Sequence, residues 1–167
     1  MKYENSRLYF ASFVRTALFV CLFFSTNPLS ADTPGRTLPD VPGWTGTVVE
    51  TRTLSSAKQE EGRMAERSYK KTDRPERVRV ILLEGPGTEW LSFPKTHTEG
   101  TDGPVGTGAT YIPLDISGKS AVLERHPVLG YSLAVRLDPE TTLTIETKAG
   151  KTLLLDFSER LLQLITD

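Results

Sequence analysis

One segment, Thr110 to Ile165, constrains the fold more than any other, because its apolar residues follow a regular spacing. In residues 131–137 and 142–146 apolar side chains alternate with polar or small ones, which is the period of two of half-buried antiparallel strands. The turns around these strands are short and contain glycine, proline, aspartate or serine, so consecutive strands are expected to pair with each other. The segment therefore predicts an antiparallel meander.

The end of the same segment predicts a helix. After Leu153-Leu154-Leu155 the spacing of apolar residues becomes helical, with side chains at Phe157, Leu161, Leu164 and Ile165. The pattern Asp156-Phe-Ser-Glu159 matches a capping box, so the helix is expected to begin near Asp156. The predicted fold class is α+β, with an antiparallel sheet of six to eight strands packed on one face by a carboxy-terminal amphipathic helix.

The first 31 residues have the order of a secretory signal peptide. Three basic residues precede an apolar run at 17–24, and the small residue Ala31 stands at the expected cleavage position. The run is shorter than the roughly 20 residues that a membrane-spanning helix needs, and an uncleaved anchor is the alternative interpretation. We therefore expect a signal peptide at 1–31, no transmembrane span after cleavage, and a periplasmic or secreted protein.

The remaining sequence predicts one domain. Residues 32–43 are rich in proline and glycine and are expected to form an extended tether. Residues 44–167 are expected to form a single α+β domain, because they are enough for one core and too few for two. Trp44, at the start of the first strand, is expected to be a packing anchor; stacking on a ligand is the alternative.

Composition excludes several classes of function. Residues 32–167 contain 17 basic and 20 acidic side chains, a net charge of −3, so no nucleic-acid partner is expected. The single cysteine, Cys21, lies inside the apolar run of the signal. Lipidation there is disfavoured by the bulky Val20 before it. Cleavage would leave no thiol for a disulfide, a nucleophile or a zinc site.

A predicted hairpin contains the highest concentration of basic residues. Its strands are expected at 63–71 and 76–83, joined by a turn at 72–75. The candidate binding residues on this hairpin are Arg63, Arg67, Lys70, Lys71, Arg77 and Arg79. Such a group favours an anionic partner, for example a membrane surface or an acidic protein. The alternative is a solvated strand that protects a sheet edge with positive charge, which the interleaved acidic residues favour.

The long segment 94–109 is rich in threonine and glycine and is expected to be a surface loop. Its Gly106-Thr-Gly108 leads into a strand instead of a helix, so it is not a phosphate-binding loop. His97, Glu99 and Asp102 are possible metal ligands, but their spacing matches no calcium loop. We therefore expect no metal and no cofactor.

The other histidine, His126, is expected to share a strand face with Glu124, and a carboxylate can orient an imidazole that acts as a general base. No recognisable nucleophile motif accompanies the pair, and a histidine before proline at a strand end is commonly a turn residue. The sequence therefore predicts no catalytic residue.

These observations predict an exported, non-catalytic binding or accessory protein of the cell envelope or extracellular space. Its partner would be another envelope macromolecule or an anionic surface. The alternative is a carrier that holds an apolar ligand, a lipid or a lipoprotein, between the sheet and the helix. Only the many leucines of the last segment suggest a carrier. An enzyme ranks third, because the residues suited to acid–base chemistry are scattered.

Overall fold

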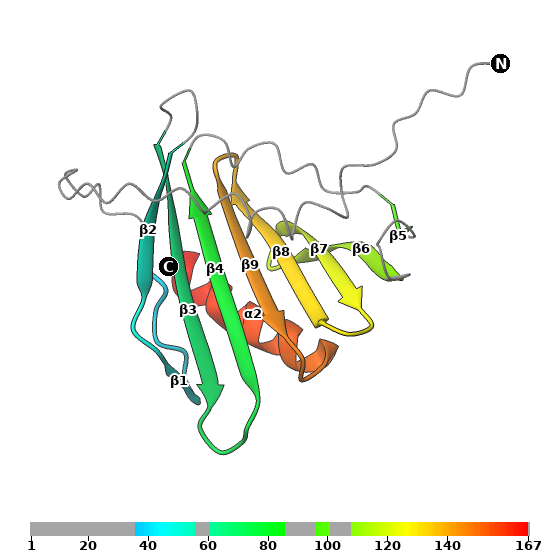
Figure 1. Cartoon of the computed structure of the whole chain (residues 1–167), viewed down its shortest axis with the longest axis horizontal. Helices are drawn as coiled ribbons and strands as arrows, with labels where there is room; N and C mark the ends of the chain where they lie inside the picture. The colour runs from blue at the N-terminus through cyan, green and yellow to red at the C-terminus, as the bar shows by residue number, and fades with distance from the viewer. Residues whose placement is uncertain (1–35, 56–60, 86–95, 101–107, 167) are drawn as a thin grey trace.

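The computed structural model describes residues 36–55, 61–85, 96–100 and 108–166. Among these residues are nine strands and one helix, α2 (Lys151–Thr166) (Figure 1). The strands are β1 (Trp44–Gly46), β2 (Glu50–Ser55), β3 (Glu61–Lys71), β4 (Arg77–Glu84), β5 (Thr98–Gly100), β6 (Ala109–Ile116), β7 (Lys119–His126), β8 (Gly130–Asp138) and β9 (Thr141–Thr147). The expected signal peptide lies outside the described residues.

All strand pairs are antiparallel, in the order β1-β3-β4-β9-β8-β7-β6-β5. The short strands β1 and β2 both pair with β3 on the side away from β4, so the nine strands occupy eight positions across the sheet. Strands β6 to β9 form the predicted meander, and β3 and β4 form the predicted hairpin. The two units join where β4 pairs with β9, for example at Val80 and Ile145. The predicted α+β class and antiparallel sheet are confirmed.

The core lies between one face of the sheet and α2, which crosses that face (Figure 1). Strand alternation explains this arrangement, because the side chains on one face of β4, β8 and β9 are mostly apolar and point to the helix. The buried residues include Val80, Leu82, Leu133, Val135, Leu143 and Ile145 from the strands, with Leu154, Phe157, Leu161 and Leu162 from the helix. The helix is therefore an integral layer of the domain.

The helix begins five residues earlier than the sequence predicted, at Lys151 instead of Asp156. Gly150 has φ of +117°, a conformation that glycine adopts readily, and its carbonyl accepts the first helical bond from Leu154 N at 3.2 Å. Asp156 is exposed in the second turn, so the pattern that resembled a capping box is not the cap. The helical spacing already starts at the buried Leu154, three residues before Phe157.

A second difference concerns Leu164, which was expected on the apolar stripe but is 42% exposed. It lies about 80° around the helix from Leu154, at the flank of the buried face. The centre of that face includes Ser158, whose hydroxyl donates to the Leu154 carbonyl at 2.7 Å. A polar residue is tolerated there because its hydrogen bond is made within the helix.

Residues 36–43, expected as part of an extended tether, lie against the domain in the structure, and we call them the strap. Leu38 and Val41 are each only 2% exposed and belong to the main core. The Tyr69 hydroxyl donates to the Pro39 carbonyl at 2.8 Å. The segment ends in a turn, where Trp44 N donates to the Val41 carbonyl at 3.0 Å, and its two apolar side chains belong to the same core cluster as the buried residues of α2. The described part of the domain therefore starts at residue 36.

Trp44 follows the strap and packs against the helix. Its ring lies 4.8 Å from that of Phe157 in an edge-to-face arrangement, and Tyr69 approaches Phe157 from 5.1 Å. Contacts of this geometry stabilise aromatic clusters beyond the area they bury. This is the packing role expected for Trp44.

Candidate functional site

The six basic residues singled out in the sequence do not share one surface. Because side chains alternate along a strand, Arg63 and Arg67 of β3 point to the helix-covered side, with the buried Ala65 and Tyr69. Lys70, Arg77 and Arg79 point to the opposite face, and Lys71 lies at the end of β3 next to Trp44. The six residues therefore have to be considered one at a time.

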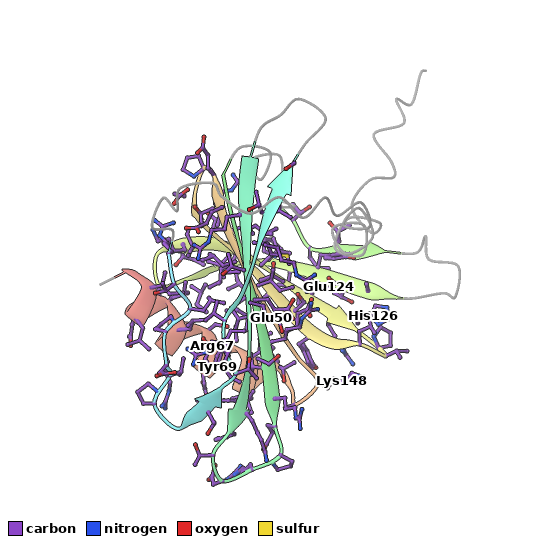
Figure 2. The ribbon with its side chains drawn as sticks, turned by 60° about the vertical axis from the view of Figure 1, so that its left-hand side comes forward. Glu50, Arg67, Tyr69, Glu124, His126 and Lys148 are labelled. Atoms are coloured by element: carbon purple, nitrogen blue, oxygen red, sulfur yellow. The ribbon has the colours of Figure 1, made fainter. Side chains whose placement is uncertain are left out.

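Arg67 fixes the strap. Its Nη1 donates to the Leu38 carbonyl and its Nε to the Thr47 carbonyl, both at 2.8 Å, and its Nη2 pairs with Asp40. The guanidinium also lies 5.1 Å from the centre of the Tyr69 ring, and the two side chains are neighbours in Figure 2. All three nitrogens of this group are thus used within the domain.

Arg63 and Arg79 are also bonded inside the molecule. Arg63 Nη1 pairs with the Glu84 carboxylate at 2.9 Å and donates to the Arg36 carbonyl at 3.0 Å. Arg79 donates from two nitrogens to Glu66, at 2.7 and 2.8 Å, and reaches Glu146 at 3.5 Å. The hydrogen bonds from Arg79 lower the pKa of the Glu66 carboxyl, outweighing the effect of burial, which raises it. Half of the predicted group is therefore neutralised locally.

The other half lies at one end of the sheet, where three turns come together. These are the β3–β4 turn, the β7–β8 turn and the loop from β9 to α2, along the lower edge of the sheet in Figure 1. Thr147 Oγ1 donates to the Arg77 carbonyl at 2.7 Å, which ties β9 to β4. Gly130 lies so close to the backbone of Thr147 and Lys148 that a Cβ there would clash at 2.5 Å. The three turns therefore form a continuous structure.

Seven basic residues come from these three turns and their flanking positions, and we call this group the basic end. Its members are Lys70, Lys71, Arg74, Arg77, Arg125, Lys148 and Lys151. The turn residues between them include two acids, Asp73 and Glu76, which gives a local net charge of +5. All seven side chains are exposed except Lys71, which is half-buried against the Trp44 ring.

Most members of the basic end make no ion pair with any residue that the structure describes. Arg74 lies 3.9 Å from Asp73, a distance typical of a weak, solvated pair. Lys70, Arg77, Arg125, Lys148 and Lys151 have no acidic partner within the described segments. Their charge is available to an external anion, unlike that of Arg63, Arg67 and Arg79.

His126 organises the β7–β8 turn of this end. Its Nδ1 accepts hydrogen bonds from the backbone amides of Val128 at 3.1 Å and Leu129 at 3.0 Å. This is the turn role considered for His126, and it commits to the backbone one of the two nitrogens that a general base could use. Glu124 lies near Tyr111. Burial, and to a smaller extent the charge of Glu124, raise the pKa of the Tyr111 hydroxyl.

Beside this turn is a shallow pocket of about 270 Å³ without an acidic residue in its lining. It is lined by Arg125, His126, Pro127, Val128, Gly130, Tyr131 and Lys148. His126 and Lys148 lie at the same end of the sheet in Figure 2. The pocket thus combines cationic and apolar atoms, a composition suited to an anionic group with an apolar neighbour.

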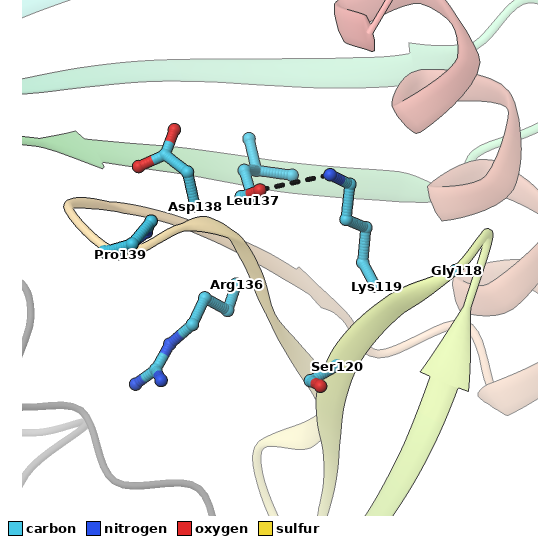
Figure 3. A pocket seen from close by; sticks show the side chains of 7 residues that line it. All are labelled: Gly118, Lys119, Ser120, Arg136, Leu137, Asp138 and Pro139. Atoms are coloured by element: carbon cyan, nitrogen blue, oxygen red, sulfur yellow. Dashed lines mark hydrogen bonds between the residues drawn. The ribbon is translucent and has the colours of Figure 1, made fainter.

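A larger pocket, of about 490 Å³, lies at the other end of the sheet between the β6–β7 and β8–β9 turns. Lys119 Nζ donates to the Leu137 carbonyl at 3.2 Å, and Arg136 points away from it (Figure 3). The Asp138 carboxylate is bound by Arg36 at 2.6 Å. Burial raises the pKa of Asp138, but hydrogen bonds from Arg36 and the Glu140 amide lower it further than burial raises it. Two of its charged groups already have internal partners, so we favour the basic end as the site.

Of the three possible metal ligands in the 94–109 segment, only the side chain of His97 lies among the described residues. His97 is exposed just before β5, and Asp102 and the side chain of Glu99 lie outside the described residues. Within the described segments no three histidine, cysteine or acidic side chains gather at one point. Of the expected loop at 94–109, residues 98–100 form β5 and pair with β6. No helix among the described residues has the length and apolar character to cross a membrane.

The chain matches no protein-family model, no curated protein and no solved structure. The function therefore has to be argued from the geometry of this molecule alone.

The candidate residues chosen from the sequence include three of the seven members of the basic end and omit the other four. Arg125, Lys148 and Lys151 lie far from the hairpin in sequence, and only the strand order brings their turns together. The available signal was that each of these residues lies next to a predicted turn of the meander. In an antiparallel meander alternate turns fall at the same end of the sheet, so their charges could have been added together.

Proposed function

We propose that the protein is an exported, non-catalytic binding protein whose basic end contacts an anionic partner. One observation carries this proposal: five basic side chains from three turns share one end of the sheet without an ion pair among the described residues. Basic residues elsewhere on the same hairpin are neutralised. Positive charge is thus concentrated where the molecule offers it to a partner.

The charge of the whole chain makes this concentration informative. The chain has a formal net charge of −1, and residues 32–167 have −3, yet the basic end has +5. A charge distribution of this kind attracts anionic partners to one end and repels them elsewhere, which orients the encounter. The proposed partner is an anionic surface or macromolecule of the cell envelope or extracellular space.

Two features support binding over catalysis or transport of an apolar ligand. The Nδ1 atom of His126 holds turn amides, which suits a structural role better than proton transfer. The sheet face that a carrier would use is filled by the buried residues of α2 and by Leu38 and Val41 of the strap. Both pockets described above lie at the two ends of the sheet, beside turns. We therefore rank the carrier second.

Export is the part of the proposal that the amino terminus supports. Mass measurement of the intact protein from its own cells should give a chain that begins at Asp32, because the signal-like segment ends at Ala31. A full-length protein retained in the cytoplasm would contradict the proposed compartment.

Retention on an immobilised polyanion tests the binding surface. The mature protein should bind a heparin column despite its net negative charge and elute with added salt. The double variant Arg125→Gln/Lys148→Gln should elute at clearly lower salt, whereas Arg160→Gln, which removes an exposed charge from the outer side of α2, should elute like the parent. Equal elution of the parent and the double variant would refute the basic end as the binding surface.

A further inference from the structure

We propose that the anionic partner is a phospholipid surface, and that Val128 and Leu129 enter its interfacial region while the basic end contacts the headgroups. This inference rests on the proposed function and specifies the partner. It starts from an observation that charge alone does not explain, namely two adjacent apolar side chains at the tip of the β7–β8 turn. Val128 is 75% exposed and Leu129 is 48% exposed.

The turn presents these two side chains in a defined conformation. His126 Nδ1 accepts hydrogen bonds from the amides of both residues, and Gly130, with φ of +95°, allows the chain to return into β8. The close approach of Gly130 to Thr147 fixes the turn against the end of β9. An ordered apolar tip loses little conformational entropy when it is buried, which favours insertion.

Cationic groups flank the apolar tip. Arg125 precedes the turn, and Lys148 lines the same pocket as Val128. Peripheral proteins bind anionic membranes by this combination, in which apolar side chains enter the interface and lysine or arginine contacts the headgroups. Each basic residue near such a surface contributes about 1 kcal/mol, or roughly fivefold in affinity.

The shape of the basic end favours a membrane over an acidic protein. It consists of turns at one end of the sheet (Figure 1). Its exposed residues include six lysine or arginine side chains, with the aliphatic Val128 and Leu129 in the same turns. The buried centre of a protein interface is usually depleted of lysine and enriched in aromatic residues. Exposed lysine and arginine side chains beside an apolar tip match a deformable anionic surface better than they match a protein interface.

Flotation with vesicles tests this inference. The mature protein should float with vesicles of phosphatidylcholine and phosphatidylglycerol and remain unbound with phosphatidylcholine alone, because the neutral lipid offers no partner for the cations. The variant Arg125→Gln/Lys148→Gln should weaken binding about 25-fold, at roughly fivefold for each charge. The control variant Arg160→Gln, which removes one exposed charge away from the basic end, should bind like the parent.

The apolar pair is tested separately. Val128→Ser/Leu129→Ser should weaken binding to the anionic vesicles by roughly tenfold or more, since apolar area then no longer enters the interface. Leu164→Ser is the control, because Leu164 is 42% exposed but lies near the end of α2 that is far from Lys151 and the basic end. The fluorescence emission that the variant Leu129→Trp adds to that of the parent should shift to the blue with anionic vesicles. It should not shift with heparin.

The outcomes separate this inference from the proposed function. If heparin retention depends on Arg125 and Lys148 but anionic vesicles are not bound, the partner is a soluble or protein polyanion and the membrane inference is wrong. Unchanged vesicle binding by the Val128/Leu129 variant would likewise reject insertion. If Arg125→Gln/Lys148→Gln changes neither binding to vesicles nor retention on heparin, the proposed function is wrong as well.

Discussion

The part of the β3–β4 hairpin away from its turn and the turn end contain the same basic residue types, but these residues have different partners. Away from the turn, Arg63, Arg67 and Arg79 bond to carbonyls and carboxylates of neighbouring segments. At the turn end, Lys70 and Arg77 make no ion pair with any described residue. Basic residues that are close in sequence are therefore not all available for binding. The fold determines which of them are neutralised by internal partners and which remain exposed to an external anion.

The largest expected effect follows from removing α2, the helix that packs on the sheet and so supports both parts of the hairpin. A mature chain ending at Gly150 lacks α2 and should not unfold cooperatively, because it loses the buried Leu154, Phe157, Leu161 and Leu162. At about 1.5–3 kcal/mol each, their gross contribution of roughly 6–12 kcal/mol is comparable with the stability of a whole domain. That sum is an upper bound, since the unfolded chain already buries part of this surface.

Thermal unfolding followed by circular dichroism provides the measurement. The substitution Leu164→Ser is the control, because this side chain is 42% exposed and should shift the transition little. A cooperative transition of the truncated chain close to that of its parent would show that α2 is a lid. The apolar-carrier alternative would then be favoured.

The next effect contrasts two neighbouring positions of β3. Arg67→Met should reduce the free energy of unfolding by about 2–3 kcal/mol, because the carbonyls of Leu38 and Thr47 lose their donor. Lys70→Met, at the basic end, should change it by less than about 0.5 kcal/mol. Urea unfolding of both variants measures the difference. Similar losses would contradict the division between internal and available charges.

A smaller effect depends on pH. Because the pKa of Glu66 is lowered from 4.5 in the folded protein, the ionised carboxylate stabilises the fold at neutral pH. This contribution is complete above the unfolded pKa and is lost as the pH falls through the folded pKa. Glu66→Gln should therefore cost about 1 kcal/mol at pH 7, a figure kept low because the pair is partly solvated.

The check is to measure unfolding of the parent and Glu66→Gln from neutral pH down through the range below 4.5. The difference between them should shrink with falling pH. A difference that stays constant would mean that the ion pair with Arg79 does not contribute through its charge.

The smallest expected effect is on the stability of the binding variant. Arg125→Gln/Lys148→Gln should unfold within about 0.5 kcal/mol of the parent, since neither side chain has an ion-pair partner among the described residues. Denaturation in urea measures this directly. A loss above about 1 kcal/mol would show that these residues serve the fold and would remove the reason for assigning them to a partner.

Most of the fold follows from local patterns in the sequence. The meander was predictable because β8 and β9 alternate cleanly and their turns are short, and the hairpin because Thr72 to Pro75 suits a turn. The start of α2 was misplaced because Leu153-Leu154-Leu155 is an apolar run whose periodicity is ambiguous, and a plausible cap follows it. The composition of the strap predicts a linker, and only tertiary packing buries Leu38 and Val41.

The candidate site was harder to predict than the fold. Lys70, Lys71 and Arg77 were identified from their position in the hairpin and do lie at the basic end. Arg63 and Arg67 also match the pattern of a basic surface, because the sequence does not show which groups a basic side chain will contact. In the structure Arg63 pairs with Glu84 and Arg67 binds the strap. The basic residues of the meander turns lie beside those of the hairpin because β4 pairs with β9. This pairing joins segments that are far apart in sequence, so no local sequence pattern predicts it.

The most direct test of the basic end as the binding surface is to map the contact residue by residue. Amide spectra of the ¹⁵N-labelled mature protein should be recorded during titration with a heparin-derived oligosaccharide. The account predicts that the shifting signals belong to residues 70–77, 125–131 and 147–151, and that they return when salt is added. Shifts confined to the middle of β3 and β4, or to the sheet end around Lys119 and Arg136, would contradict it.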